Sequence, residues 1–499
     1  MACMLPIATR LVPGSFPHPI ETLELRETAI SWVVLTGDYA YKIKKPLHLD
    51  YLDASTLERR RILCEEELRL NRRFAPELYL EVVAISEGGG FPYIDRQAAR
   101  QPIEYAVRMR QFARSDELVS QLAADSVPSE ELAAFGTQLA AWHRKAAVLQ
   151  DADVGAVEAV TAQVMGNLAS LLERADAPTR PRLKALESGT QHELVHLADL
   201  IAARQRDARV RECHGDLHAG NLVSWKGKWL PFDCLEFAPK LRWIDVMSDV
   251  AFLYMDLRSR SRPDLAFAFI DGYLESSGDY AGLPLLSFFA VYRALVRAKV
   301  DDLDGHSARR DERIATAERL THAGEAALIL MHGPSGSGKS WLSRQLVPGL
   351  GAVRVRSDLE RRRLLGAEAH TQQADETTYQ RLYACAGSAL DAGLAVILDA
   401  TFLAASRRRS FRDLARHHAS AYVVIDCRAP IEILEARVDR RMRETLDPSE
   451  ADLSILHRQL SAPEPFAADE LSSVLQVDTT SPDAVAFTIA QLSKRLRGS

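Results

Sequence analysis

Alternating apolar and polar positions divide the first hundred residues into short strands and one helix. Residues 28–45 contain an apolar run and an alternating run separated by Gly37-Asp38, and this pattern predicts a β-hairpin. Leucine and isoleucine recur broadly at helical spacing over residues 55–75, and Pro76 follows them. This spacing, closed by a proline, predicts a helix.

The stretches that follow predict the rest of a small sheet and then a helical region. Residues 79–86 and 103–112 are expected to complete the sheet, with the glycines at 88–90 as the turn between them. Residues 130–206 and 263–303 are rich in apolar residues at helical spacing and predict several helices. The first part of the chain is therefore expected to be α+β.

The last third has a different pattern, in which short apolar runs alternate with helical stretches. A charged, Ala-rich segment at 306–325 precedes it and predicts a linker helix. The apolar runs are 326–332, 352–356, 395–399 and 421–426. Strands that alternate with helices predict a parallel α/β sheet. The expected fold class is therefore α/β and α+β, in two domains.

Composition and charge limit the class of protein. A chain of 499 residues with 47% hydrophobic and 26% charged residues is expected to be globular with more than one domain. Its 62 basic and 68 acidic side chains give a net charge of −6, so no overall basic surface indicates nucleic acid. The six cysteines show no CxxC or Cys/His spacing, which favours a reducing compartment. Without a signal sequence or a long apolar span, we expect a cytoplasmic protein that does not cross a membrane.

The sequence CHGDLHAGN at residues 213–221, with Asp233 in the following WLPFDCLEF, carries the first candidate chemistry. Phosphoryl transfer to a hydroxyl needs an acceptor for the hydroxyl proton, ligands for Mg²⁺ and a cation on the triphosphate. Asp216 is the candidate base. Asn221 and Asp233 are candidate magnesium ligands, because Mg²⁺ prefers hard oxygen ligands.

Lys42 is the candidate cation of this site. It lies in Ala-Tyr-Lys on the second strand of the hairpin, a pattern typical of a kinase strand whose lysine reaches the α- and β-phosphates. One of Glu65, Glu66 and Glu67 is expected to pair with it, and we favour Glu67. Alternatively, the lysines of this strand form a solvated edge. No G-x-G-x-x-G precedes the strand, so a different loop, around Gly37, is expected to cover the phosphates.

Residues 25–305 resemble the aminoglycoside phosphotransferase and choline kinase branch of the protein-kinase-like fold. The resemblance is carried by AYKIKKP, by HGDLHAGN, and by FDCLEF followed by a helix with Asp245 and Asp249. It implies a bilobal fold with a small β lobe and a helical lobe. It also implies ATP and Mg²⁺ as cofactors and a small-molecule hydroxyl as acceptor. We expect Asp245 and Asp249 to be structural and to support the catalytic loop through its backbone amides.

A second nucleotide signature stands in the last third. Residues 333–340 match G-x-x-x-x-G-K-S between a predicted strand and a predicted helix. In such a P-loop (Walker A sequence) the backbone amides surround the β-phosphate at the start of the helix. We expect Lys339 to bridge the β- and γ-phosphates and Ser340 to ligate Mg²⁺. The candidate cofactor-binding residues are Gly333, Pro334, Ser335, Gly336, Ser337, Gly338, Lys339 and Ser340.

Charged residues after the later strands complete this second site. Asp358 follows the second predicted strand and is a candidate base, since ligands gather at the carboxyl ends of parallel strands. Asp399 ends the strand 395–399 and is expected to act on magnesium through water. Arg437 and Arg441, four positions apart on one helix face, are candidates for a lid that neutralises charge in the transition state. Alternatively, Asp358 only caps the helix that follows it, and the helix with Arg437 and Arg441 is a solvated basic helix.

Residues 326–499 resemble the zeta-toxin and polynucleotide-kinase-like branch of P-loop kinases. The P-loop, SDLERRR, VILDAT and the paired arginines carry the resemblance. It implies acceptors such as nucleic-acid 5′-hydroxyls or amino-sugar nucleotides. The whole chain resembles bacterial proteins described as bifunctional phosphotransferase/ATP-binding proteins.

We therefore hypothesise two ATP-dependent kinase modules in tandem, each of which phosphorylates a hydroxyl. The predicted domains are residues 1–110 (N-lobe), 111–305 (helical C-lobe), 306–325 (linker) and 326–499 (P-loop kinase). Three alternatives remain open. The P-loop part is a nucleic-acid 5′-hydroxyl kinase, it is an ATP-binding regulator of the first module, or the first module is a non-catalytic binding module.

Overall fold

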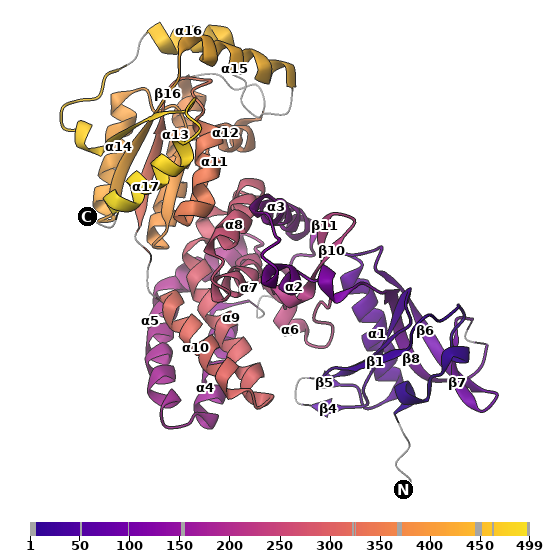
Figure 1. The fold of residues 1–499 in the computed structure, drawn as a ribbon. Coiled ribbons are helices and arrows are strands. Elements are labelled where there is room, and N and C mark those ends of the chain that lie inside the picture. The colour runs from indigo at the N-terminus through magenta and orange to yellow at the C-terminus, as the bar shows by residue number, and fades with distance from the viewer. Residues whose placement is uncertain are drawn as a thin grey trace. The chain divides into compact units, whose positions relative to one another are not determined.

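The computed structural model of the protein contains two compact units, which are described separately below (Figure 1). The first unit comprises Met1–Val127, Lys145–Ala156 and Gln205–Asp249, and the second comprises Pro128–Arg144, Val157–Arg204 and Val250–Ser499. The structure describes residues 6–49, 52–97, 99–150, 155–321, 324, 326–366, 372–444, 452–461 and 464–496.

A six-stranded antiparallel sheet forms the core of the first unit, with strand order β1-β2-β3-β8-β6-β7. Helix α1 (Leu57–Asn71) packs against β6 and β8, and Thr56 caps it by accepting a hydrogen bond from the Arg59 amide at 3.3 Å. The strands are β1 (Glu24–Glu27), β2 (Ser31–Leu35), β3 (Tyr39–Lys44), β6 (Tyr79–Gly88), β7 (Phe91–Asp95) and β8 (Pro102–Arg110).

Two features of this sheet differ from the sequence prediction. The glycine turn leads from β6 into β7, a strand that the sequence analysis missed because it carries a proline, and β7 pairs with β6 at the sheet edge. Gly37 lies at the far end of β3 from Lys44, and its amide donates to Gln111 Oε1 at 3.0 Å. The β1–β2 turn, residues 28–30, is the turn beside the lysine end, where the Lys45 amide donates to the Ile30 carbonyl at 2.9 Å.

The remaining part of the first unit holds the catalytic-loop sequence between two small strand pairs. β9 pairs with β12 on one side of the sequence, and the hairpin β10–β11 follows it. Two strands, β10 and β11, therefore separate Asn221 from Asp233. The elements are η3 (Arg114–Asp116), α2 (Leu118–Ala123), β9 (Val210–Glu212), η4 (Ala219–Asn221), β10 (Leu222–Trp225), β11 (Lys228–Pro231), α6 (Pro239–Arg242) and β12 (Trp243–Asp245).

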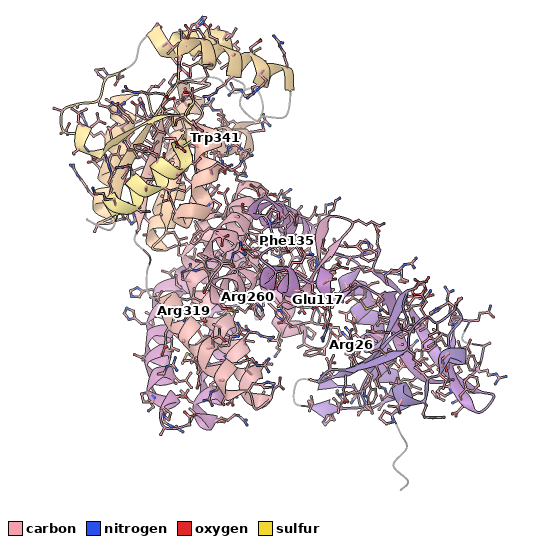
Figure 2. The ribbon with its side chains drawn as sticks, in the orientation of Figure 1. Arg26, Glu117, Phe135, Arg260, Arg319 and Trp341 are labelled. Carbon is pink, nitrogen blue, oxygen red and sulfur yellow. The ribbon has the colours of Figure 1, made fainter. Side chains whose placement is uncertain are left out.

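Helices make up the first half of the second unit. Phe135 of α3, which is labelled in Figure 2, stacks on Phe269 of α8 with ring centroids 5.8 Å apart. Helix α10 packs along α9. His143 is buried and lies 3.1 Å from the Tyr273 hydroxyl, as expected for a core histidine. The elements are α3 (Ser129–Lys145), α4 (Val157–Arg174), α5 (Thr179–Arg206), α7 (Val246–Ser259), α8 (Pro263–Ser277), η5 (Tyr280–Gly282), α9 (Pro284–Leu303) and α10 (Ser307–Thr321).

A parallel sheet with strand order β14-β15-β13-β16-β17 completes the second unit. Strands β13, β14 and β15 and most of β16 are buried runs, as parallel strands covered on both faces require, whereas β17 at one edge alternates between buried and exposed residues. The predicted fold class is confirmed. The elements are β13 (Ala327–His332), α11 (Lys339–Leu350), β14 (Ala352–Arg356), α12 (Ser357–Leu365), α13 (Gln372–Asp391), β15 (Ala395–Asp399), α14 (Ala405–His417), β16 (Ala421–Arg428), α15 (Ile431–Glu444), α16 (Leu453–Ser461), η6 (Leu471–Ser473), β17 (Val474–Asp478) and α17 (Ala484–Leu496).

The cysteines of the described residues pack as small core side chains. Cys64, Cys213, Cys234, Cys385 and Cys427 are all free and buried. Within the described part of the chain, no helix has the length and apolar content needed to cross a membrane.

Candidate active sites

The catalytic loop of the first unit fixes the orientation of the Asp216 carboxylate. Asn221 Nδ2 donates to Asp216 Oδ2 at 3.1 Å and to the Asp216 carbonyl at 2.9 Å. His218 Nδ1 accepts from the Gly220 amide at 3.0 Å, so the ring proton resides on Nε2, which lies 3.5 Å from Asp216 Oδ2. The Asn221 amide and the His218 ring both lie against Oδ2 and so hold Asp216 in one orientation, as a base for a bound hydroxyl requires.

Buried polar groups support this loop from behind. Asp249 accepts hydrogen bonds from the backbone amides of His214 (3.1 Å) and Gly215 (2.9 Å), which is the supporting role expected from the sequence. His214 Nε2 donates to the Phe232 carbonyl at 3.0 Å and ties the loop to the segment that carries Asp233. Burial lowers the pKa of His214, so this histidine is neutral and structural.

Lys42 lies in a buried cluster of opposite charges. Its ammonium contacts Glu67 Oε1 at 2.8 Å and also pairs with Asp233. Burial lowers the pKa of Lys42, but Asp233 and Glu67 outweigh burial and raise it well above its usual value. Burial raises the pKa of Glu67, but Lys42 and Lys44 outweigh it and lower this pKa to about 2. Both groups of the Lys42–Glu67 pair are therefore charged at neutral pH.

The other two glutamates on α1 have different partners. Glu65 lies 3.5 Å from Arg61 on the exposed face of the helix. Glu66 lies 2.6 Å from Arg242. The structure therefore places Glu67, the residue favoured from the sequence, beside the strand lysine.

Lys44 and Glu236 belong to the same cluster, and the sequence analysis missed them. Lys44 contacts Glu67 Oε2 at 2.5 Å and pairs with Glu236, and both side chains of the Lys44–Glu236 pair are only 2% exposed. The alternation of β3 was the available signal, since residues 42 and 44 share one face of a strand. Glu236 comes from a distant segment and carries no local signal.

Asn221 and Asp233 have the chemistry of magnesium ligands. The Asn221 amide nitrogen is bound to Asp216, so its carbonyl oxygen is the atom presented to a cation. Asp233 has a left-handed backbone (φ 62°), which is uncommon outside glycine and occurs at functional sites. Its amide donates to the Tyr79 hydroxyl at 3.0 Å, which supports this conformation. The residues present therefore fit Mg²⁺.

The P-loop of the second unit forms as the sequence predicts. Gly333, Gly336 and Gly338 all have positive φ. A Cβ at Gly333 would lie 2.7 Å from the Cys427 carbonyl, and one at Gly336 would lie 2.6 Å from the Leu434 carbonyl. Glycine is therefore required for both conformation and space. The Lys339 ammonium donates to the Gly333 and Pro334 carbonyls at 2.8 and 2.7 Å.

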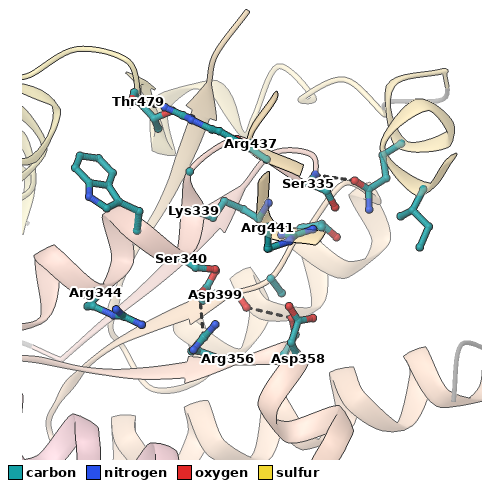
Figure 3. A pocket seen from close by; sticks show the side chains of 18 of the residues that line it. Ser335, Lys339, Ser340, Arg344, Arg356, Asp358, Asp399, Arg437, Arg441 and Thr479 are labelled. Atoms are coloured by element: carbon teal, nitrogen blue, oxygen red, sulfur yellow. Dashed lines mark hydrogen bonds and ion pairs between the residues drawn. The ribbon is translucent and has the colours of Figure 1, made fainter. Parts of the chain in front are cut away.

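A cavity of about 1030 Å³ opens in front of this loop (Figure 3). Ser335, Gly336, Gly338, Lys339 and Ser340 of the P-loop sequence line it. Its charged lining is strongly basic: Lys339, Arg344, Arg356, Arg361, Arg362, Arg437, Arg440, Arg441 and Arg458 face Asp358, Asp375 and Asp399. A cavity of this size and charge is suited to a polyanion such as a nucleoside triphosphate.

Asp358 and Asp399 reach the cavity from the ends of β14 and β15. Asp358 is the second residue of α12 and lines the cavity beside Ser357. Asp399 is 5% exposed, and its Oδ2 has no hydrogen bond among the described residues. The Arg356 guanidinium lies near this oxygen, with its Nε 3.6 Å from Oδ2. A buried carboxylate oxygen with no hydrogen bond suits a cation, so Asp399 and the Ser340 hydroxyl fit Mg²⁺.

Both candidate lid arginines line the cavity. Arg437 donates to Thr479 Oγ1 at 2.9 Å, to the Thr479 carbonyl at 3.1 Å and to the Gly336 carbonyl at 3.3 Å. It therefore links the P-loop to the loop after β17. Arg441 lies one helical turn further along α15 and lines the cavity.

The proteins that resemble this chain cover both halves. The AAA_33 family, described as an AAA domain, matches residues 328–466. The uncharacterized proteins Rv2004c of Mycobacterium tuberculosis and Mb2027c of Mycobacterium bovis are each 32% identical over 456 residues, which is 85% of this chain and 88% of theirs.

Two solved structures resemble parts of the chain. A choline/ethanolamine kinase family protein from Mesorhizobium loti covers 60% of this chain and 88% of its own, with 13% identity and a TM-score of 0.37. A gluconokinase from Sinorhizobium meliloti covers 35% of this chain and 96% of its own, with 18% identity and a TM-score of 0.28.

Proposed function

Because the chain belongs to the same family as Rv2004c and Mb2027c of the mycobacteria, whose alignment with it spans both halves, we propose that it is an ATP-dependent phosphotransferase with two kinase modules. One observation carries this proposal. The first unit contains Lys42, Asp216, Asn221 and Asp233, and the second contains Lys339, Ser340, Asp358 and Asp399, so each unit has side chains of the types that phosphoryl transfer needs. No single ATP site would use both sets.

In the first module, Asp216 accepts the proton of a small-molecule hydroxyl. The hydroxyl oxygen forms a bond to the γ-phosphorus while the bond from that phosphorus to the bridging oxygen breaks, and ADP leaves with the electron pair. Lys42, held by Glu67, binds the ATP phosphates. Asn221 and Asp233 would hold Mg²⁺, which supplies positive charge to the phosphate oxygens.

In the second module, the P-loop amides and Lys339 bind the triphosphate, and Asp358 accepts the proton of a second hydroxyl. Ser340 and Asp399 would hold Mg²⁺. Arg441, on the face of α15 that borders the cavity, neutralises charge that develops on the transferred group. Arg437 keeps the P-loop and the loop after β17 together and so acts mainly by positioning. Both modules work by orientation and charge compensation without a covalent intermediate.

A small-molecule acceptor for the second module is favoured over a nucleic-acid 5′-hydroxyl. A groove for nucleic acid beside Asp358 would use the neighbouring arginines. However, the Arg354 side chain is 1% exposed and paired with Asp271 and Glu275. Arg363 donates to the Glu275 carbonyl at 2.7 Å. Arg354 and Arg363 therefore bind protein groups, and the neighbouring Arg356, Arg361 and Arg362 line the cavity instead.

Transfer from γ-labelled ATP to a metabolite extract tests the proposal. Wild-type protein should label two classes of acceptor. Asp216→Ala should lose one class and Asp358→Ala the other, each by about 100-fold or more, because a general base contributes about 10²–10⁴-fold. Glu173→Ala, at an exposed position of α4, is the control and should label both. If Asp358→Ala leaves all labelling intact, the second module is a regulator, and if neither variant loses labelling, the proposal is wrong.

A further inference from the structure

Helix α8 places two carboxylates against the edge strand of the parallel sheet. β14 is the edge strand, and an edge strand needs a cover for its backbone groups. The Arg354 amide donates to Asp271 Oδ1 at 3.1 Å, and the Tyr280 hydroxyl donates to the Arg354 carbonyl at 2.8 Å. Residues from the helical half of the second unit therefore complete the hydrogen bonding of β14 at this position.

The Arg354 side chain extends this connection into the P-loop helix. Its guanidinium contacts Glu275 Oε1 at 2.5 Å and Asp271 Oδ2 at 3.3 Å. Its Nη1 donates to the Ser340 carbonyl at 3.3 Å and to Ser343 Oγ at 3.4 Å. Arg354 thus joins the carboxylates of α8 to the backbone of Ser340, the proposed metal ligand.

Arg356 makes a parallel connection to the other proposed ligand. Residues 354 and 356 share one face of β14. Arg356 Nη1 lies 3.8 Å from Glu275 Oε1, and its Nε lies 3.6 Å from Asp399 Oδ2. Charges of alternating sign therefore run from Asp271 through Arg354, Glu275 and Arg356 to Asp399.

Because these five charged side chains are largely buried, the stability of each charge depends on its neighbours in the row. A guanidinium that is 1% exposed is stable only while both carboxylates compensate its charge, and removal of one partner leaves a buried charge unpaired. Glu275 also shares the charge of Arg356. Loss of Glu275 would remove one carboxylate that compensates Arg356, and the guanidinium would then compete more strongly with a cation for the Asp399 carboxylate, 3.6 Å away.

We propose that Asp271 and Glu275 are positioning residues of the P-loop site, which hold Ser340 and Asp399 in place for Mg²⁺-nucleotide through Arg354 and Arg356. This inference rests on the proposed nucleotide binding by the P-loop. The metal site of the predicted P-loop domain, residues 326–499, would then depend on helix α8 of the predicted helical lobe, residues 111–305. Because such coupling is reciprocal, binding of Mg²⁺-nucleotide also stabilises α8.

The test uses the full chain with Lys42→Met, so that ADP binds only at the P-loop, and it follows the part of the tryptophan fluorescence change that Trp341→Phe abolishes. Trp341 is the one tryptophan of residues 326–499 and lines the cavity. ADP is titrated with Mg²⁺ and, separately, with excess chelator. Glu275→Gln should weaken Mg²⁺-dependent binding about tenfold, as loss of a group that orients a metal ligand does, and leave metal-free ADP binding within about twofold. Asp264→Asn is the matched control, because Asp264 lies on the same helix and pairs with Arg262 at 2.8 Å.

Three outcomes decide the inference. An unchanged Mg²⁺ dependence in Glu275→Gln overturns it, and so does an equal loss of metal-free and metal-dependent binding, which would show general damage to the fold. Asp271→Asn provides a second measurement of the ratio between ADP affinity with Mg²⁺ and ADP affinity with chelator. A melting scan confirms that each variant is folded. If wild-type protein and Lys339→Ala give the same signal with ADP, the proposed nucleotide site itself is wrong.

Discussion

Lys44 shows how a single residue changes the interpretation of the first module. A kinase-type lysine and its glutamate form a pair, but here Glu67 lies between Lys42 and Lys44, and Glu236 pairs with Lys44. Two cations and their counter-charges therefore lie side by side in a buried environment, where such groups stabilise the fold only as a complete set. From the sequence, one of three glutamates on the following helix is expected to pair with Lys42, and Glu67 is favoured. The sequence could not predict Glu236, because nothing local specifies which side chain meets Lys44.

Glu67→Gln is expected to destabilise the first unit by about 3 kcal/mol at pH 7, because it leaves buried lysine charge uncompensated. The pKa of Glu67 is lowered from 4.5 to about 2 in the folded state. Its contribution is therefore present above pH 4.5 and is lost as the pH falls towards 2. Urea unfolding of wild-type protein and Glu67→Gln at pH 7 and at pH 3 measures the loss in free energy of unfolding at each pH.

Glu65→Gln is the control for this experiment, since the exposed Glu65–Arg61 pair contributes at most about 1 kcal/mol. The destabilisation by Glu67→Gln should shrink between pH 7 and pH 3. A difference that stays constant over this range would show that Glu67 does not hold its charge as described.

At the scale of elements, two glycines allow α3 and α8 to cross with their backbones in contact. A Cβ at Gly272 would lie 2.0 Å from the Ala133 carbonyl, and one at Gly136 would lie 2.2 Å from the Phe269 carbonyl. The obstacle in both cases is backbone, which cannot rotate away. This crossing fixes α8, the helix that carries Asp271 and Glu275.

Gly272→Ala should therefore lower the free energy of unfolding of the second unit by about 3 kcal/mol or more, as overpacking against rigid groups does. Gly189→Ala in α5 is the matched control, since a Cβ there meets nothing within 4 Å. That change should stabilise by up to about 1 kcal/mol, because alanine favours helix. Chemical denaturation of both variants measures the difference, and equal effects would contradict the described crossing.

Elements with a strong local pattern were predictable, and elements that depend on distant partners were not. The hairpin of β2 and β3 and the strand–loop–helix of the P-loop were read from alternation, glycines and an apolar run. β7 contains Pro92 and β17 is a short strand of mixed polarity, so neither carries a clear signal. The contact of α8 with β14 joins residues 83 positions apart at Asp271 and Arg354, and no periodicity in either segment indicates it.

At the scale of the molecule, the chain joins two proposed phosphate-binding sites that are built differently. The first uses a lysine on an antiparallel sheet and a catalytic loop, and the second uses backbone amides at the start of a helix on a parallel sheet. The alignment with Rv2004c spans 85% of this chain and 88% of that protein. The order of the two sites was predictable, because each is carried by a short contiguous motif. Their acceptors were not, because the walls of each acceptor site come from distant segments.

Calorimetric titration of the full chain with a non-hydrolysable ATP analogue and Mg²⁺ tests the two-site account most directly. Wild-type protein should bind two nucleotides per chain. Lys339→Ala and Lys42→Met should each bind one, and the double variant none, because each lysine supplies the cation for one set of phosphates. A wild-type stoichiometry of one, or two nucleotides still bound by Lys339→Ala, would contradict the account.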